Sequence, residues 1–175
     1  DTPEFTDVHG GDWFYDSVQY VSKNKLMTGL NETTFGPYDF LARAQFAVIL
    51  HRMNGEPEIP YSPRFHDVSA GLWYTDAILW AADTGVVTGY TNGNFGPGDN
   101  INREQMALMM YRYANYKSYD TSARADFSSY QDASMVSDFA EEAMQWAVGE
   151  KIITGKYNET QLDPKGNASR AECAT

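Results

Sequence analysis

The apolar residues of this chain recur at helical spacing, in a pattern that occurs three times. The first stripe of the middle copy consists of Tyr74, Ala77, Ile78, Ala81 and Ala82, which together form one face of a predicted helix. An apolar pair, the dipeptide Thr-Gly and a turn-rich loop follow, and a second apolar stripe predicts another helix. Each copy is therefore expected to contain two helices joined by a loop.

The three copies align along nearly their whole length. A shift of 60 places residues 5–52 on residues 65–112 without a gap, and the third copy follows with shifts that grow from 65 to 67. We expect repeats at residues 1–58, 59–122 and 123–175, with linkers at 54–64 and 115–126. Units of this size are marginal alone, so the copies should depend on one another for a core.

The start of each helix has a recognisable signal. The first helices should begin at an aromatic residue, namely Trp13, Trp73 or Phe139, and the helix of the middle copy should close at Gly85 in a left-handed conformation. The second helices begin with ARAQ, NREQ or SRAE. Asn102 and Ser169 fit the spacing of a capping box, whereas Ala42 offers no capping side chain.

An arginine occupies the start of every second helix, as Arg43, Arg103 and Arg170. The N-terminus of a helix carries a partial positive charge and disfavours a cation, so each arginine needs a partner. One interpretation is a ligand carboxylate or phosphate held by the guanidinium and the helix-end amides. The other is an ion pair with an acidic residue of the chain, and five aspartates are suitable: Asp7, Asp39, Asp67, Asp99 and Asp132.

Two further sets of repeated residues could serve either packing or binding. The aromatic residues Trp13, Trp73 and Phe139 could stack on a sugar or pack in the core. The glycines Gly29, Gly89 and Gly155 could form a turn or let the backbone approach a ligand. Tyr90 follows Gly89 and is a candidate contact in one copy only.

Composition narrows the range of partners. The formal net charge of −11 argues against nucleic acid and against an anionic membrane surface, so an anionic ligand would have to be bound locally. No apolar run is long enough for a membrane span, no signal peptide is visible at the start, and one cysteine excludes an internal disulfide. The three histidines lack metal-ligand spacing, and there is no GxSxG or P-loop motif. We expect no catalysis, no metal and no cofactor.

The repeated motifs resemble those of a triplet of S-layer homology domains. The resemblance rests on the opening F-x-D-V at Phe5 and Phe65, the T-G step, the F-x-P loop and the arginine motif, and it covers all but the linkers. The third copy departs from it at Ala133 and Leu162, and the middle copy at Glu104.

This resemblance implies an all-α fold in which three helix-loop-helix repeats form a pseudo-threefold, three-pronged spindle. It also implies an extracellular module at the cell wall or S-layer that anchors an exported protein, with a fused effector domain, by binding pyruvylated secondary cell-wall polysaccharide. The ligand-binding residues would be Arg43, Arg103 and Arg170, which hold the carboxylate in grooves between neighbouring repeats, with Gly29, Gly89 and Gly155 supplying amides and Trp13, Trp73 and Phe139 contacting sugar.

Two other functions remain open at this point. A helical-repeat module for protein interaction in surface-layer assembly would place the arginines in ion pairs. An enzyme acting on the wall would need a pair of carboxylates in one groove, which the sequence does not place together.

Overall fold

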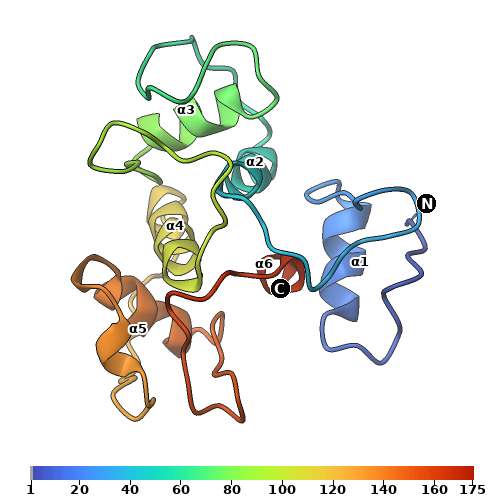
Figure 1. The fold of residues 1–175 in the computed structure, drawn as a ribbon, viewed down its shortest axis with the longest axis vertical. Coiled ribbons are helices and arrows are strands. Elements are labelled where there is room, and N and C mark those ends of the chain that lie inside the picture. Colours follow the sequence, from blue (N-terminus) through green and yellow to red (C-terminus); the bar gives the residue numbers. More distant parts are fainter. Residues whose placement is uncertain (1) are drawn as a thin grey trace.

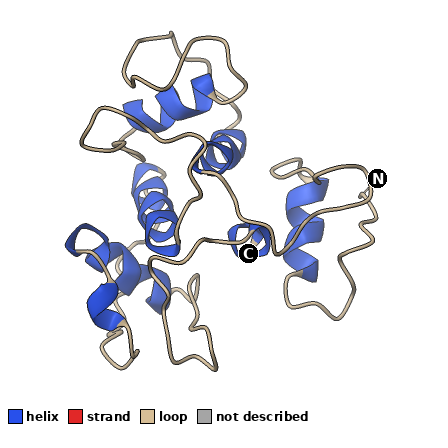
Figure 2. Ribbon diagram, in the orientation of Figure 1, coloured by secondary structure: helices blue, strands red, loops and turns tan. Residues whose placement is uncertain are grey.

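The computed structural model describes residues 2–175, and within them the regular structure is helical (Figures 1 and 2). The α-helices are α1 (Tyr15–Lys23), α2 (Arg43–Met53), α3 (Thr75–Asp83), α4 (Arg103–Tyr116), α5 (Glu141–Gly149) and α6 (Arg170–Ala174). Two 3-10 turns, η1 (Ala133–Met135) and η2 (Asp138–Ala140), precede α5. The described part of the chain contains isolated backbone bridges but no strand, which confirms the all-α prediction.

The first helices begin slightly later than predicted. Trp13 and Trp73 stand two residues before α1 and α3, in turns closed by backbone hydrogen bonds such as Thr75 N to Leu72 O at 3.1 Å. The aromatic residues therefore lie outside the helices that they introduce. Gly85 follows α3 with φ of 81°, as predicted, but the equivalent Lys25 and Lys151 adopt φ of 57° and 59° without the freedom of glycine.

Each second helix packs against the first helix of another repeat. Contacts join α2 to α3 and α4 to α5, and α6 returns to pack against α1 at the opposite end of the sequence. Figure 1 shows the three pairs around a common centre, with α2, α4 and α6 nearest to it. The buried apolar residues of all three repeats form one continuous core, which agrees with the expected dependence of the repeats on one another.

A closed ring of backbone hydrogen bonds joins the repeats at this centre. The amide of Leu41 donates to Ala168 O at 3.2 Å, Ala168 N donates to Ile101 O at 2.9 Å, and Ile101 N donates to Leu41 O at 2.8 Å. These residues occupy equivalent positions two residues before the three arginines, and all are buried. The ring fixes the N-termini of α2, α4 and α6 relative to one another.

None of the helices in residues 2–175 has the combination of length and apolar composition that crossing a bilayer requires.

Candidate functional site

The first amides of the second helices bond to the loop of a neighbouring repeat. Arg43 N donates to Asp99 O at 2.8 Å and Ala44 N donates to Pro97 O at 3.1 Å. The equivalent amides of α4 bond to Gly166 and Pro164, and those of α6 bond to Asp39 and Pro37. The unpaired N–H groups expected at a helix start are thus satisfied within the protein, which leaves the guanidinium groups, not these amides, as candidates for a ligand.

The same loops explain how a cation is tolerated at each helix N-terminus. The Nε atoms of Arg43, Arg103 and Arg170 donate to the carbonyl oxygens of Phe95, Leu162 and Phe35 at 3.0, 2.8 and 2.9 Å. Each arginine therefore turns away from its own helix toward carbonyl dipoles of another repeat. The three side chains are almost fully buried, with exposed fractions of 4 to 6%.

The opening aspartates have a structural task. The carboxylate of Asp67 accepts the amides of Phe95 and Gly96, both at 2.8 Å, and so holds the loop that receives Arg43. Asp7 holds Phe35 and Gly36 in the same way, and Asp132 holds Leu162 and Asp163. None of the five aspartates considered from the sequence forms an ion pair with the arginines within residues 2–175, so the ion-pair interpretation is wrong in that form.

The arginines differ in their charged neighbours. Arg103 is paired with Glu172 of α6, whereas no carboxylate of residues 2–175 pairs with Arg43 or Arg170. Burial lowers the pKa of Arg43 and of Arg170, because each charge has lost water, and nearby Asp99 and Asp39 offset this in part. The Arg43 guanidinium carbon lies 4.7 Å from the ring centre of Tyr90 and 4.8 Å from that of Phe95.

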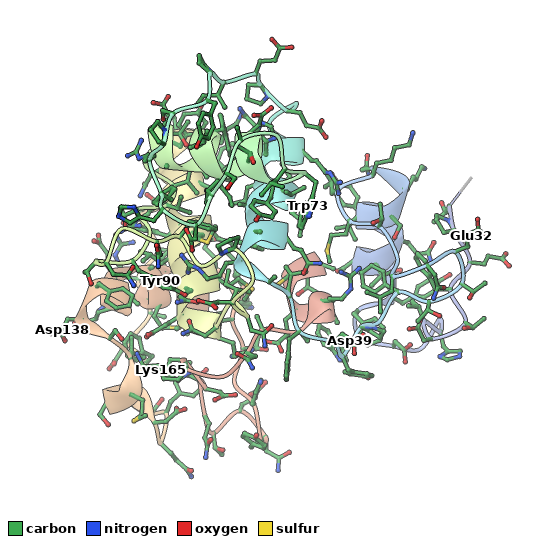
Figure 3. All side chains as sticks on the ribbon, turned by 45° about the horizontal axis from the view of Figure 1, so that its top comes forward. Glu32, Asp39, Trp73, Tyr90, Asp138 and Lys165 are labelled. Carbon is green, nitrogen blue, oxygen red and sulfur yellow. The ribbon has the colours of Figure 1, made fainter. Side chains whose placement is uncertain are left out.

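A groove of about 210 Å³, the Arg170 groove, lies beside Arg170. Its polar and aromatic lining consists of Thr28, Gln45, Arg52, Trp73 and Arg170. The lining comes from all three repeats, because Arg170 belongs to the third, Trp73 to the second and the other residues to the first. Figure 3 shows Trp73 beside α2, across which the groove runs.

A second groove of about 390 Å³, the Arg43 groove, repeats this arrangement one repeat further along. Its corresponding lining consists of Arg43, Thr88, Gly89, Gln105, Arg112 and Phe139. Tyr90 also lines this groove and is labelled in Figure 3; its hydroxyl donates to Asp99 Oδ2 at 2.9 Å. Burial and this hydrogen bond raise the pKa of Tyr90.

The repeated aromatic residues are exposed. Trp13, Trp73 and Phe139 have exposed fractions of 61, 67 and 63%, so the core interpretation of these residues is wrong. Trp73 and Phe139 border the two grooves just described. Trp13 packs edge-on against Phe14, with 5.2 Å between the ring centres.

The repeated glycines lie against the opening aromatic residues. A Cβ atom added at Gly89 would lie 2.5 Å from Phe65 Cε1, and one at Gly29 would lie 2.6 Å from Phe5 Cε1. At Gly155 it would meet Tyr130 Cε1 at 2.8 Å. Close packing thus accounts for the glycines without a ligand, although Gly89 also lines the Arg43 groove.

Glu104, which departs from the repeated motif, does not line either groove. Its carboxylate accepts from Ser137 N at 2.9 Å and Ser137 Oγ at 2.8 Å, and Lys165 pairs with it. It therefore holds the turn before α5 against α4. The lone Cys173 lies 3.5 Å from Met106 Sδ, and burial raises the pKa of its thiol, as expected for a packing residue.

Sequence reasoning aligned Arg52 with Arg112 but assigned them no role. Both line a groove, on the same helix face as Gln45 and Gln105 seven residues before them. Arg52 Nη1 donates to Leu26 O at 3.3 Å, and burial lowers the pKa of Arg112. The sequence did contain a signal for these two residues. In both repeats an arginine follows a glutamine by seven residues, on a helix face that is otherwise apolar.

Comparison with known proteins identifies the repeats. The S-layer homology domain family matches residues 4–47, 64–107 and 129–174. Over 97% of its length the chain is 34% identical to an endoglucanase of Bacillus sp. strain KSM-635 and 31% identical to an amylopullulanase of Thermoanaerobacterium thermosulfurigenes. It is also 28% identical, over 97% of its length, to the S-layer protein EA1 of Bacillus anthracis. It spans only 18, 9 and 19% of these relatives.

Proposed function

Because the chain belongs to the S-layer homology family, we propose that it is a non-catalytic carbohydrate-binding module that anchors an exported protein to the bacterial cell wall. The family and the S-layer relatives place the chain outside the cell, in the cell wall or S-layer. The chain corresponds to a small part of each relative, and two of those relatives are named endoglucanase and amylopullulanase. The full-length protein would accordingly carry a fused effector domain.

The proposed ligand is an anionic cell-wall polysaccharide that carries pyruvate ketals. The observation that supports it best is a pair of buried arginines, Arg43 and Arg170, that face grooves without a carboxylate partner in residues 2–175. A pyruvate ketal presents a carboxylate on a sugar ring. A guanidinium would bind the carboxylate, while the exposed Trp73 or Phe139 would contact the ring.

The second arginine of each groove would strengthen the preference for an anion. Arg52 and Arg112 line the grooves together with Arg170 and Arg43, so each groove holds two cations in a chain whose net charge is −11, and of these four Arg52 also lies 3.7 Å from Oε1 of the exposed Glu56. Local positive charge of this kind favours a carboxylate over a neutral sugar even though the whole molecule repels anions. Thr28, Thr88 and the cap residues Gln45 and Gln105 supply further polar groups.

We also propose that the arrangement is a pseudo-threefold, three-pronged spindle composed of the repeats 1–58, 59–122 and 123–175. The helix pairs α1 with α6, α2 with α3 and α4 with α5 would be its prongs, and the hydrogen-bond ring would mark its axis. Such an arrangement would place a groove beside each of Arg43, Arg103 and Arg170, and all three repeats would contribute residues to each groove.

The direct test is calorimetry with a methyl glycoside that carries one pyruvate ketal, compared with the same sugar without it. Binding of the first and none of the second is expected, because only the first has a carboxylate for the guanidinium. Co-sedimentation with isolated sacculi before and after removal of pyruvate provides the second measurement. Equal binding to both sugars, or no loss on depyruvylation, would refute the proposed ligand.

The protein-interaction alternative makes the opposite prediction for wall polymer stripped of protein, which then should not bind. That alternative requires Arg43, Arg103 and Arg170 to form ion pairs, and of these three only Arg103 is paired within residues 2–175. The two unpaired arginines therefore favour the carbohydrate proposal.

A further inference from the structure

The three second helices carry equivalent residues at the third helical position, namely Gln45, Gln105 and Glu172. Each side chain closes its helix N-terminus by accepting a backbone amide through Oε1. Gln45 accepts Ala42 N at 2.8 Å, Gln105 accepts Asn102 N at 3.1 Å, and Glu172 accepts Ser169 N at 3.3 Å. The capping task is therefore common to the three residues and does not distinguish glutamine from glutamate.

The other terminal atom of these side chains does distinguish them. Glu172 Oε2 pairs with Arg103 Nη1, and Lys156 Nζ lies 3.9 Å from Oε1 of the same carboxylate. In Gln45 and Gln105 an amide NH₂ group stands in place of that oxygen. Because this group is a hydrogen-bond donor, it cannot pair with a guanidinium but can donate to an anion.

The hydrogen bonds of the arginines follow this difference. All three nitrogens of Arg103 have an acceptor: Leu162 O for Nε, Glu172 for Nη1 and Thr154 O at 3.0 Å for Nη2. Within residues 2–175, Arg43 donates only from Nε, and Arg170 donates from Nε and Nη2 but not from Nη1. The two arginines whose grooves contain glutamine thus retain free donors, and the arginine beside glutamate does not.

We infer that Glu172 acts as a built-in carboxylate at Arg103, so that this chain binds an anionic ligand beside only two of its three helix-start arginines. This inference rests on the proposed function, since it concerns the same ligand and the same type of groove. A ligand carboxylate at Arg103 would have to displace Glu172 from a nearly buried guanidinium and then lie beside that displaced charge. Both steps oppose binding, because a broken buried pair leaves an uncompensated charge and like charges repel.

Arg103 is accordingly a residue that joins α4 to the third repeat, through Leu162, Thr154 and Glu172. Arg43 and Arg170 are the residues that bind ligand. The equivalent positions of the three arginines in the repeated motif conceal this division.

The decisive measurement is the stoichiometry of the monopyruvylated glycoside in calorimetry. Wild-type chain should bind two equivalents, Gln105→Glu should bind one, and Glu172→Gln should bind three. Each substitution keeps the oxygen that closes the helix N-terminus, and circular dichroism checks that Glu172→Gln still folds although it loses the pair with Arg103. A value of three for the wild-type chain, or an unchanged value in either variant, would overturn the inference.

A double variant removes the pair itself. Arg103→Gln with Glu172→Gln should still bind two equivalents, whereas Arg43→Gln and Arg170→Gln should each bind one. Loss of an equivalent in the double variant would show that Arg103 binds ligand and would contradict the inference while leaving the proposed function intact. Absence of binding by every chain, including wild type, would instead refute the proposed function.

Discussion

At the scale of single residues, Gly89 tests the packing explanation for the Thr-Gly step. Gly89→Ala should lower the free energy of unfolding by at least about 2 kcal/mol, because a left-handed alanine costs about 1–2 kcal/mol and the added carbon would collide with Phe65. Gly98→Ala is the matched control, since no atom lies within 4 Å of its added carbon. Urea unfolding measures both, and equal stability of the two variants would contradict this explanation.

Asp67 provides a second test at this scale. Asp67→Asn should destabilise the chain by about 1–3 kcal/mol, because the carboxamide can accept only one of the two loop amides and turns a donor toward the other. The exposed Glu32, replaced by Gln, controls for the loss of one negative charge. If Asp67→Asn and Glu32→Gln have the same urea midpoint, the aspartate does not hold the loop.

The arginines show how far residue-level reasoning from sequence reaches. Electrostatics at a helix start identified Arg43, Arg103 and Arg170 as residues in need of partners, and the structure places Arg43 and Arg170 in the lining of the two grooves. The electrostatic argument could not distinguish Arg103 from Arg43 and Arg170. The partner of Arg103 is Glu172, and the spacing of Glu172 from Ser169 already explains that glutamate as a capping residue. The pair joins residues 69 positions apart, which local patterns do not report.

At the scale of elements, the helix N-termini differ in a way that the sequence does predict. Asn102 accepts Gln105 N through its side chain and Ser169 accepts Glu172 N, whereas Ala42 has no such bond. Its backbone is already extended, with φ of −76° and ψ of 152°, so a capping side chain fits without rearrangement. Ala42→Ser should therefore stabilise the chain by about 0.5–2 kcal/mol.

Thermal unfolding measures this gain, and Asn102→Ala supplies the reciprocal loss at an equivalent position. A midpoint that rises for Ala42→Ser and falls for Asn102→Ala would support the capping account. If Asn102→Ala lowers the midpoint and Ala42→Ser leaves it unchanged, then the loop carbonyls that bond Arg43 and Ala44 already stabilise the start of α2 fully.

The helices themselves could be predicted because their apolar stripes are local, but their partners could not. Periodicity places Val18 and Val21 on one face of α1 without indicating that this face meets α6. The same limit explains the aromatic residues. Trp73 looks like a core residue until α3, which follows it, is known to pack against α2, an arrangement in which the Trp73 ring borders the Arg170 groove.

At the scale of the whole molecule, the closing contact between α6 and α1 distinguishes a ring of repeats from an open stack. In an open stack, each repeat contacts only its neighbours in sequence, so damage to the last repeat would leave the first intact. Here α6 packs against α1, and Arg170 bonds to Phe35 and Thr28 of the first repeat. Stability should therefore be coupled between the two ends of the chain.

Removal of residues 169–175 tests this coupling by hydrogen exchange. The amides of α1 (Tyr15–Lys23) should lose protection, because the truncated chain leaves their helix without its packing partner and the first-repeat loop without Arg170. The amides of α3 (Thr75–Asp83) are the internal control, because α2 still covers them and should keep them protected longer. A chain in which α5 loses protection while α1 keeps it would behave as an open stack, and the ring would then contribute nothing to stability.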